Sequence, residues 1–271
     1  MKLKKIIKSN KFLYYIARQI RKIQYYLIPM GKFRYKRFLR SNGILKNKYI
    51  EKIKDYKDKH KGQRCFIIAT GPSLTVEDLE KLKNEITFGM NSISKIGEKT
   101  DWRPTYYGIQ DEFVYEKLKD SILKIDKNIT IFTSDVLAKK KKLLSNNIVQ
   151  IPLYCMDHLI NPNSSKFKFS NNCHDIVYDG YSITYTLMQL AVYMGFNKIY
   201  LLGADCSYAK NGPQHFIETG VNDLGIDFIT ERLFNSYQVA KKSVEENGVK
   251  IYNATRGGCL EIFPRVSMDE I

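Results

Sequence analysis

Residues 65–78 read Cys-Phe-Ile-Ile-Ala-Thr-Gly-Pro-Ser-Leu-Thr-Val-Glu-Asp, an apolar run that ends in a glycine turn and leads into a helix start. The run Cys65–Ala69 is typical of a strand buried on both faces. Gly71 allows a tight turn and the close approach of a ligand to the backbone, and Thr75-Val-Glu-Asp78 fits a capping box. This order predicts a parallel α/β sheet whose first turn cradles a phosphate or ribose; the alternative is an ordinary strand-to-helix turn.

Beyond this turn, short apolar runs alternate with helical patterns. Further strands are expected at residues 86–90, 105–109, 129–133, 148–153, 198–203 and 249–252. Helices are expected at residues 76–83, 112–124, 135–144, 182–193 and 227–246. The alternation predicts a Rossmann-like, mostly parallel sheet with helices on both faces, forming one domain over residues 64–271. Residues 154–180, rich in Asn, Ser, His and Asp, are expected to form a long loop or lid.

Polar residues follow several of these strands, where a parallel sheet binds its ligands. Asn91 offers an amide to a base or a sugar hydroxyl. Asp111, next to Gln110, follows the third strand, and its alternative role is the solvated start of a helix. Asp179 and Gly180 precede a later helix. The residues expected to bind a nucleotide after these strands are Gly71, Pro72, Ser73, Asn91, Asp111, Asp179 and Gly180.

The strand end at residues 201–208 carries Asp205 and Tyr208, and His215 follows ten residues after Asp205. An imidazole titrates near physiological pH, and Asp205 or Glu218 can orient it, so His215 is the histidine best placed as a general base. We therefore expect Asp205 and His215 to be catalytic and Tyr208 to contact the nucleotide. The alternative for His215 is an ordinary histidine in a surface loop.

The C-terminal strand ends in Asn253-Ala-Thr-Arg256-Gly-Gly258, the only Arg-Gly-Gly of the chain. Arg256 is expected to hold a phosphate with two hydrogen bonds, unless this segment is an ordinary surface turn. The chain lacks the GxGxxG and Walker sequences, so NAD and P-loop hypotheses lose support. The five cysteines are scattered and form no CxxC pair, which favours a reducing compartment and predicts neither a disulfide framework nor a metal site.

The net charge of +16 is confined to the start of the chain. Residues 1–64 contain 21 Lys or Arg and three acidic residues, whereas residues 65–271 contain 23 Lys or Arg and 25 acidic residues. A nucleic-acid enzyme would more usually spread basic residues around its groove, so no nucleic-acid partner is expected. No apolar run approaches the length of a membrane-spanning helix, and residues 1–30 lack the pattern of a secretion signal.

Residues 1–40 contain 13 Lys or Arg, eight aromatic residues and no acid. Apolar residues recur at helical spacing from Ile6 to Leu27, until Pro29 ends the pattern. A basic amphipathic helix with aromatic residues is typical of a segment that lies on an anionic membrane surface. We expect residues 1–63 to form this arm and a polar linker; the alternatives are a helix packed on the body and a nucleic-acid contact.

Four segments together resemble a known family: residues 66–74, Tyr178-Asp-Gly180, residues 194–205 and His215-Phe-Ile-Glu218. They are similar to domain of unknown function 115, the family named for an archaeal 6-hydroxymethylpterin diphosphokinase. They also resemble the bacterial sialyltransferases of glycosyltransferase family 42. The resemblance covers about residues 64–260 and implies a CMP-sugar site at the Gly71 turn and Asn91, with His215 as the base. Family 42 has Ser-Gly in place of Asp179-Gly180, and one alignment of its base falls on Thr219 instead of His215.

The leading hypothesis is a glycosyltransferase of bacterial surface-polysaccharide assembly, which takes a nucleotide-activated, CMP-linked sugar and passes it to a lipid-linked or oligosaccharide acceptor. It needs no metal cofactor. It is expected in the bacterial cytoplasm, on the inner face of the cytoplasmic membrane. The first alternative is a diphosphokinase that transfers pyrophosphate from ATP, with magnesium held by Asp111 and Asp205. The second is a non-catalytic nucleotide-binding scaffold.

Overall fold

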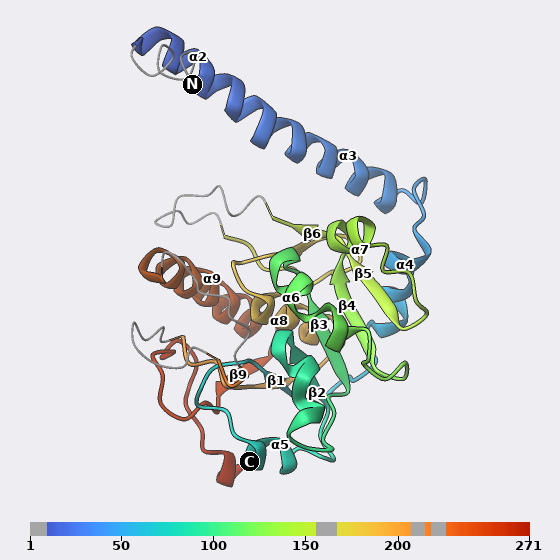
Figure 1. Cartoon of the computed structure of the whole chain (residues 1–271), viewed down its shortest axis with the longest axis vertical. Coiled ribbons are helices and arrows are strands. Elements are labelled where there is room, and N and C mark those ends of the chain that lie inside the picture. Colours follow the sequence, from blue (N-terminus) through green and yellow to red (C-terminus); the bar gives the residue numbers. More distant parts are fainter. Residues whose placement is uncertain (1–9, 156–166, 207–214, 218–225) are drawn as a thin grey trace. The chain divides into compact units, whose positions relative to one another are not determined.

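The computed structural model describes residues 10–155, 167–206, 215–217 and 226–271 of the chain (Figure 1). It divides into two compact units, Met1–Lys46 and Asn47–Ile271. The larger unit contains the sheet and is called the body here. The smaller unit contains the basic helices and is called the arm.

The body is built on a seven-stranded sheet in which all neighbouring strands are parallel, which confirms the predicted Rossmann-like fold (Figure 1). Its strands are β1 Arg64–Ile68, β2 Thr87–Met90, β3 Tyr106–Ile109, β4 Thr130–Ser134, β5 Ile148–Ile151, β8 Lys198–Leu202 and β9 Lys250–Asn253. The spatial order is β5-β4-β3-β2-β1-β8-β9. The chain therefore runs outward from β1 to β5 and then returns to the other side of β1, so the strand order reverses between β1 and β8.

Alternate residues of the central strand face opposite layers of helices. Ile67 packs in one cluster with side chains of α8 and α9, whereas Phe66 and Ile68 pack in another with side chains of α5 and η3. A third cluster joins β3 to α6 and α7. Both faces of the sheet are thus buried, which explains why its strands are continuous apolar runs. The helices are α5 Val76–Glu80, η3 Asn91–Glu98, α6 Glu112–Ile122, α7 Asp135–Lys141, α8 Ile183–Tyr193 and α9 Ile226–Glu246, and η5 Met268–Glu270 follows them.

Residues 47–63 belong to the body, so the boundary expected after residue 63 is wrong and lies between Lys46 and Asn47. Two short helices, α4 Lys48–Glu51 and η2 Lys52–Tyr56, begin this segment. Ile53 is fully buried in the core cluster of α8. The amides of His60 and Gly62 donate to the carbonyls of Met194 and Gly195 at 2.8 and 2.9 Å. These contacts are distant in sequence, and the polar composition of the segment conceals them.

The stretch expected to be a loop or lid contains a second, two-stranded sheet of β6 Leu153–Tyr154 and β7 Val177–Tyr178. Gln189 of α8, which is fully buried, holds this stretch to the core. Its Oε1 accepts from the amides of Ser170 and Tyr178, each at 3.0 Å, and its Nε2 donates to the Tyr178 carbonyl at 2.7 Å. Residues 156–166 lie outside the described residues.

The arm is helical from Lys11 to Ser41: α2 Lys11–Lys22, a π-helical turn η1 Ile23–Leu27 and α3 Ile28–Ser41. Asn10 caps α2 by accepting from the amides of Phe12 and Leu13. Pro29 was expected to end the helical pattern, but it lies in the first turn of α3, where proline is tolerated because its missing amide hydrogen is not needed. Within the described residues, no helix is long and apolar enough to cross a membrane.

The packing of His60 generates a testable pH dependence. Burial lowers the pKa of His60 below its usual value of 6.5, and its ring stacks on Phe196 and contacts the Tyr106 hydroxyl at 2.7 Å. The unfolded chain therefore takes up this proton before the folded chain does, so the free energy of unfolding falls as the pH drops through about 6.5. We expect His60→Gln to flatten this slope in urea titrations between about pH 7.5 and 5.5. An unchanged slope would show that residues 57–63 do not pack as described.

Candidate functional site

A cavity of about 170 Å³ lies beyond the carboxyl ends of β1, β2 and β8, where the strand order reverses. This is the position at which open parallel sheets bind ligands. Five of the predicted site residues line it: Gly71, Pro72, Asn91, Asp205 and His215. Its other lining residues were not predicted: Ala69, Thr70, Met90, Thr184, Gly203, Ala204, Cys206 and Tyr237. Thr184 had no signal in the sequence, because it lies in an apolar helix.

The turn after β1 packs directly against the turn after β8. The Gly71 amide donates to the Gly203 carbonyl at 2.8 Å, and the Ser73 hydroxyl donates to Asp205 Oδ2 at 2.8 Å. A Cβ atom on Gly71 would overlap the Asp205 carboxylate and lie 2.5 Å from the Gly203 carbonyl oxygen. Only glycine therefore fits at this position. The sequence predicted a close approach here, but to a ligand and not to a second turn.

The anion that this turn holds is the carboxylate of Asp205. Asp205 is 6% exposed, and burial raises its pKa, although the hydroxyl and the amide of Ser73 partly offset this by stabilising the charged form. The hydrogen-bond donors of Gly71 and Ser73 are thus already used within the protein. The prediction that the donors of Gly71 and Ser73 bind a phosphate is therefore wrong. Gly71 and Pro72 line the cavity, while Ser73 positions Asp205.

Two residues that line the cavity have left-handed backbones without being glycine. Asn91 has φ +46° and Cys206 has φ +51°. The Tyr107 hydroxyl donates to the Asn91 carbonyl at 2.6 Å, which helps to hold this conformation. Strained backbone of this kind often marks a functional position. The Asn91 side-chain amide makes no hydrogen bond with any other described residue, so it is available to a ligand.

His215 reaches the cavity because its loop is held to the first turn. The Phe216 amide donates to the Thr70 carbonyl at 2.8 Å, and the Lys99 ammonium lies 5.2 Å from the centre of the Phe216 ring. His215 and Asp205 therefore line one cavity, as the sequence analysis expected. Glu218, which was considered as a partner of His215, lies outside the described residues, as does Tyr208.

Arg256 pairs with Asp78 and does not line the cavity. Asp78 also completes the capping box of α5: the Thr75 amide donates to Asp78 Oδ2 at 3.0 Å, and Thr75 Oγ1 accepts from the Asp78 amide. The start of α5 is thus capped by its own side chains, and Arg256 neutralises Asp78 there. Because Arg256 pairs with Asp78 and does not line the cavity, the structure does not bring this arginine to the site where a phosphate was expected.

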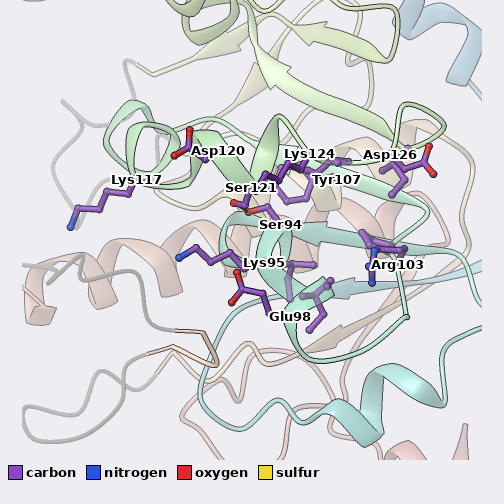
Figure 2. A pocket seen from close by; sticks show the side chains of 16 residues that line it. Ser94, Lys95, Glu98, Arg103, Tyr107, Lys117, Asp120, Ser121, Lys124 and Asp126 are labelled. Carbon is purple, nitrogen blue, oxygen red and sulfur yellow. Dashed lines mark hydrogen bonds between the residues drawn. The ribbon is translucent and has the colours of Figure 1, made fainter.

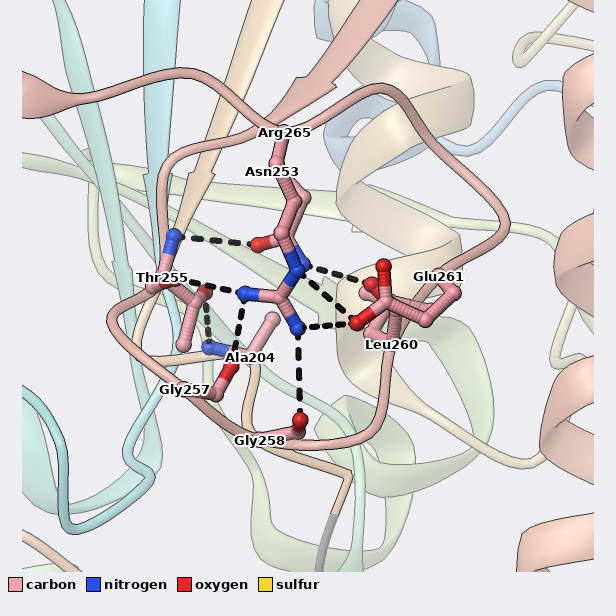
Figure 3. A network of polar contacts seen from close by, with 8 residues as sticks. All are labelled: Ala204, Asn253, Thr255, Gly257, Gly258, Leu260, Glu261 and Arg265. Carbon is pink, nitrogen blue, oxygen red and sulfur yellow. Dashed lines mark hydrogen bonds and ion pairs between the residues drawn. The ribbon is translucent and has the colours of Figure 1, made fainter.

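The loop after β9 forms the wall of the site behind Asp205. The Cys259 amide donates to the Asp205 carbonyl at 2.7 Å. Figure 3 shows the guanidinium of Arg265 inside this loop, where it donates to the carbonyls of Thr255 and Gly257 at 3.0 and 2.7 Å. Thr255 Oγ1 in turn accepts from the Ala204 amide at 3.0 Å. Arg265 therefore fixes the loop, a role that the sequence analysis missed.

Asp111 and Asp179 do not line the cavity. Asp111 caps α6 by accepting from the Val114 amide at 2.9 Å, which is the alternative role considered for it. It follows β3, three strand spacings or about 14 Å from Asp205 after β8. Ligands of one magnesium ion lie about 2.1 Å from it, so these two carboxylates cannot share one. No group of three His, Cys, Asp or Glu suited to a metal occurs within the described residues.

A larger cavity of about 430 Å³ lies between η3 and α6, away from the carboxyl ends of the strands. Figure 2 shows Ser94 and Ser121 near its middle, with Arg103 and Asp126 at one end and Lys117 at the other. The two serine hydroxyls lie 2.7 Å apart. Its charged side chains are exposed and of both signs. We assign the functional site to the smaller cavity, because the strand reversal and the predicted polar residues meet there.

The Gly71 contact predicts a specific loss of stability. We expect Gly71→Ala to lower the free energy of unfolding by about 1–3 kcal/mol, because the added methyl must displace Asp205 or the backbone of Gly203. Gly31→Ala is the matched control, since nothing lies within 4 Å of a Cβ atom at that position of α3. Urea denaturation measures both. A Gly71→Ala protein as stable as the parent would contradict the described packing of the two turns.

Among solved structures, the chain is similar to the MAf glycosyltransferase from Magnetospirillum magneticum AMB-1, with 16% sequence identity and a TM-score of 0.53. The alignment covers 84% of this chain and 40% of that chain, so this protein spans less than half of the glycosyltransferase. At this identity the likeness shows a common fold.

A comparison with curated proteins finds no match. A family model does match: residues 41–211 fit the family described as 6-hydroxymethylpterin diphosphokinase MptE-like. The matched region is more than half of the chain and includes the Gly71 turn, Asn91 and the Asp205 strand end. The expected resemblance to the family named for a 6-hydroxymethylpterin diphosphokinase is therefore confirmed, and the chain belongs to the MptE-like family.

Proposed function

We propose that the protein is a glycosyltransferase of bacterial surface-polysaccharide assembly, which takes its sugar from a CMP-linked donor. The observation that carries the proposal is that Asn91, Asp205 and His215 line one cavity at the strand reversal. The family and the fold of the MAf glycosyltransferase support a transferase. The acceptor in this proposal is a lipid-linked or free oligosaccharide.

In the proposed reaction, the His215 imidazole takes the proton of an acceptor hydroxyl. That hydroxyl oxygen bonds to the anomeric carbon of the donor sugar. The bond from this carbon to the phosphate oxygen breaks, and its electron pair leaves with the nucleotide. Asn91 would contact the nucleotide through its available amide. Asp205 would act as a buried carboxylate that holds the Gly71 turn and the neighbouring strand end in place.

The family to which the chain belongs favours a second candidate, a diphosphokinase. Such an enzyme needs a divalent cation to neutralise the transferred phosphates. The described residues do not fit the magnesium site considered for it, because Asp111 and Asp205 are too far apart. Dependence on a divalent cation therefore separates the two candidates.

Replacing the proposed base tests the reaction directly. We expect the protein to release nucleotide from CMP-N-acetylneuraminic acid or a related donor in the presence of EDTA. His215→Ala should lower this rate by about 10²- to 10⁴-fold while leaving nucleotide affinity unchanged. His174→Gln, a histidine outside the cavity, serves as the control. Turnover of ATP that requires magnesium would instead support the diphosphokinase, and retained turnover by His215→Ala would remove His215 from the mechanism.

We further propose that the arm binds the inner face of the cytoplasmic membrane, where lipid-linked acceptors are found. Six aliphatic residues of its helices are exposed: Leu13, Ile16, Ile20, Ile23, Leu27 and Ile28. The aromatic rings of Phe12, Tyr14 and Tyr15 are exposed as well. Together with the excess of Lys and Arg, these side chains suit an anionic bilayer surface, to which each cation near it contributes about 1 kcal/mol.

Replacing two exposed isoleucines of the arm tests this second proposal. We expect the double variant Ile16→Gln, Ile20→Gln to bind vesicles of phosphatidylglycerol at least tenfold more weakly, because burial of an isoleucine is worth about 1.5–3 kcal/mol. Ala17→Gln introduces the same side chain between them and should bind like the parent. Cosedimentation measures all three proteins. Equal binding by the double variant, or no binding by the parent, would contradict the proposal.

A further inference from the structure

A pair of polar side chains, one buried and one partly buried, lies beside the cavity, at the carboxyl end of the next strand. Gln110 follows β3, the neighbour of β2, and Asp179 follows β7 of the small sheet. Gln110 Nε2 donates to Asp179 Oδ1 at 2.6 Å. Asp179 is 6% exposed and Gln110 is partly buried, so this is a partly buried contact between a carboxylate and an amide. Neither residue is used in the reaction proposed above.

The carboxylate fixes the orientation of the Gln110 amide. A carboxylate oxygen requires a donor, so the NH₂ group of Gln110 must face Asp179 and its Oε1 must face away. Gln110 Oε1 is buried and accepts no hydrogen bond from any residue that the structure describes. Leaving a buried acceptor without a partner costs about 1–3 kcal/mol. An unpaired group of this kind in a folded protein calls for an explanation, and a ligand that supplies the donor is one.

The loop around Asp179 is rigid. Gly180 and Tyr181 both have left-handed backbones, with φ +55° and +65°. A Cβ atom on Gly180 would overlap the Tyr185 ring, and the Ser236 hydroxyl donates to the Gly180 carbonyl at 3.0 Å. The Tyr181 amide donates to Asp179 Oδ2 at 3.3 Å. The carboxylate is thus held in place before any ligand arrives.

The pair also lies next to the nucleotide cavity. Adjacent strands are about 4.8 Å apart, so the end of β3 lies within the width of one sugar ring of Asn91 at the end of β2. The helix that follows Asp179 contributes Thr184 to the cavity lining. We propose that Gln110 and Asp179 form a subsite for a vicinal diol, with hydroxyl groups donating to Gln110 Oε1 and to the carboxylate. This inference rests on the proposed function.

The diol can belong to the ribose of the nucleotide or to the transferred sugar, and three nucleotides and two free sugars distinguish these sources. Binding is measured by calorimetry with CMP, with 2′-deoxy-CMP and with CMP-N-acetylneuraminic acid. Free ribose and free N-acetylneuraminic acid are tested at millimolar concentration by their effect on thermal unfolding. The variants are Gln110→Met, which removes the amide at similar volume, and the milder Asp179→Asn. Gln150→Met is the control, because Gln150 is a buried amide of β5 that bonds to Asn47, far from the cavity.

We expect Gln110→Met to lower the affinity about tenfold for the ligands that carry the recognised diol, a factor typical of a lost hydrogen bond. If the ribose is bound, CMP weakens and 2′-deoxy-CMP does not. If the sugar is bound, CMP-N-acetylneuraminic acid loses its advantage over CMP. Asp179→Asn should weaken the binding of the same ligands as Gln110→Met. Gln150→Met should leave the binding of every ligand unchanged.

If Gln110→Met weakens the binding of all three nucleotides equally, or of none of them, the proposed subsite is overturned. The proposed function would remain intact. A different outcome is that no nucleotide binds the parent protein, while a free sugar binds the parent but not the Gln110→Met protein. The subsite would then stand, and the proposed CMP-linked donor would be wrong. If neither nucleotide nor sugar binds, both proposals are overturned.

Discussion

The contact between Gly71 and Asp205 is the constraint on which the site depends. It joins the turn after β1 to the turn after β8 at the point where the strand order reverses. Because the Gly71 amide and the Ser73 hydroxyl are satisfied by Gly203 and Asp205, the two turns hold each other without a ligand. A pre-organised wall of this kind lowers the entropy cost of binding. It also leaves recognition of the nucleotide to residues around the turn, such as Asn91.

The C-terminal loop adds further hydrogen bonds on the far side of Asp205. The Cys259 amide bonds to the Asp205 carbonyl, and Arg265 fixes the carbonyls of the loop that carries Cys259. Arg256, by contrast, neutralises Asp78 at the start of α5. Arg265 thus stabilises the loop behind Asp205, whereas Arg256 stabilises the start of α5. The strong positive charge of the chain lies elsewhere, in the arm and in the first residues of the body.

The features of the fold that depend on local sequence could be predicted, and those that depend on distant contacts could not. The apolar runs of the seven strands and Gly71 are local signals, and the structure confirms the parallel sheet they predict. His215 reaches the cavity as expected because its loop follows a strand at the reversal. The packing of residues 47–63 on the sheet, the use of the Gly71 turn by Asp205 and the pairing of Arg256 with Asp78 each join segments far apart in the chain. Neither periodicity nor a motif reports such contacts.

A crystal structure of the protein with CMP would test the central claim most directly, because it shows whether the nucleotide binds in the cavity at the strand reversal or in the larger one between η3 and α6. We expect the nucleotide to lie between the Gly71 turn and residues 203–206, in contact with the Asn91 amide and beside His215. A nucleotide bound instead in the larger cavity between η3 and α6, among Lys95, Arg103 and Lys124, would contradict it.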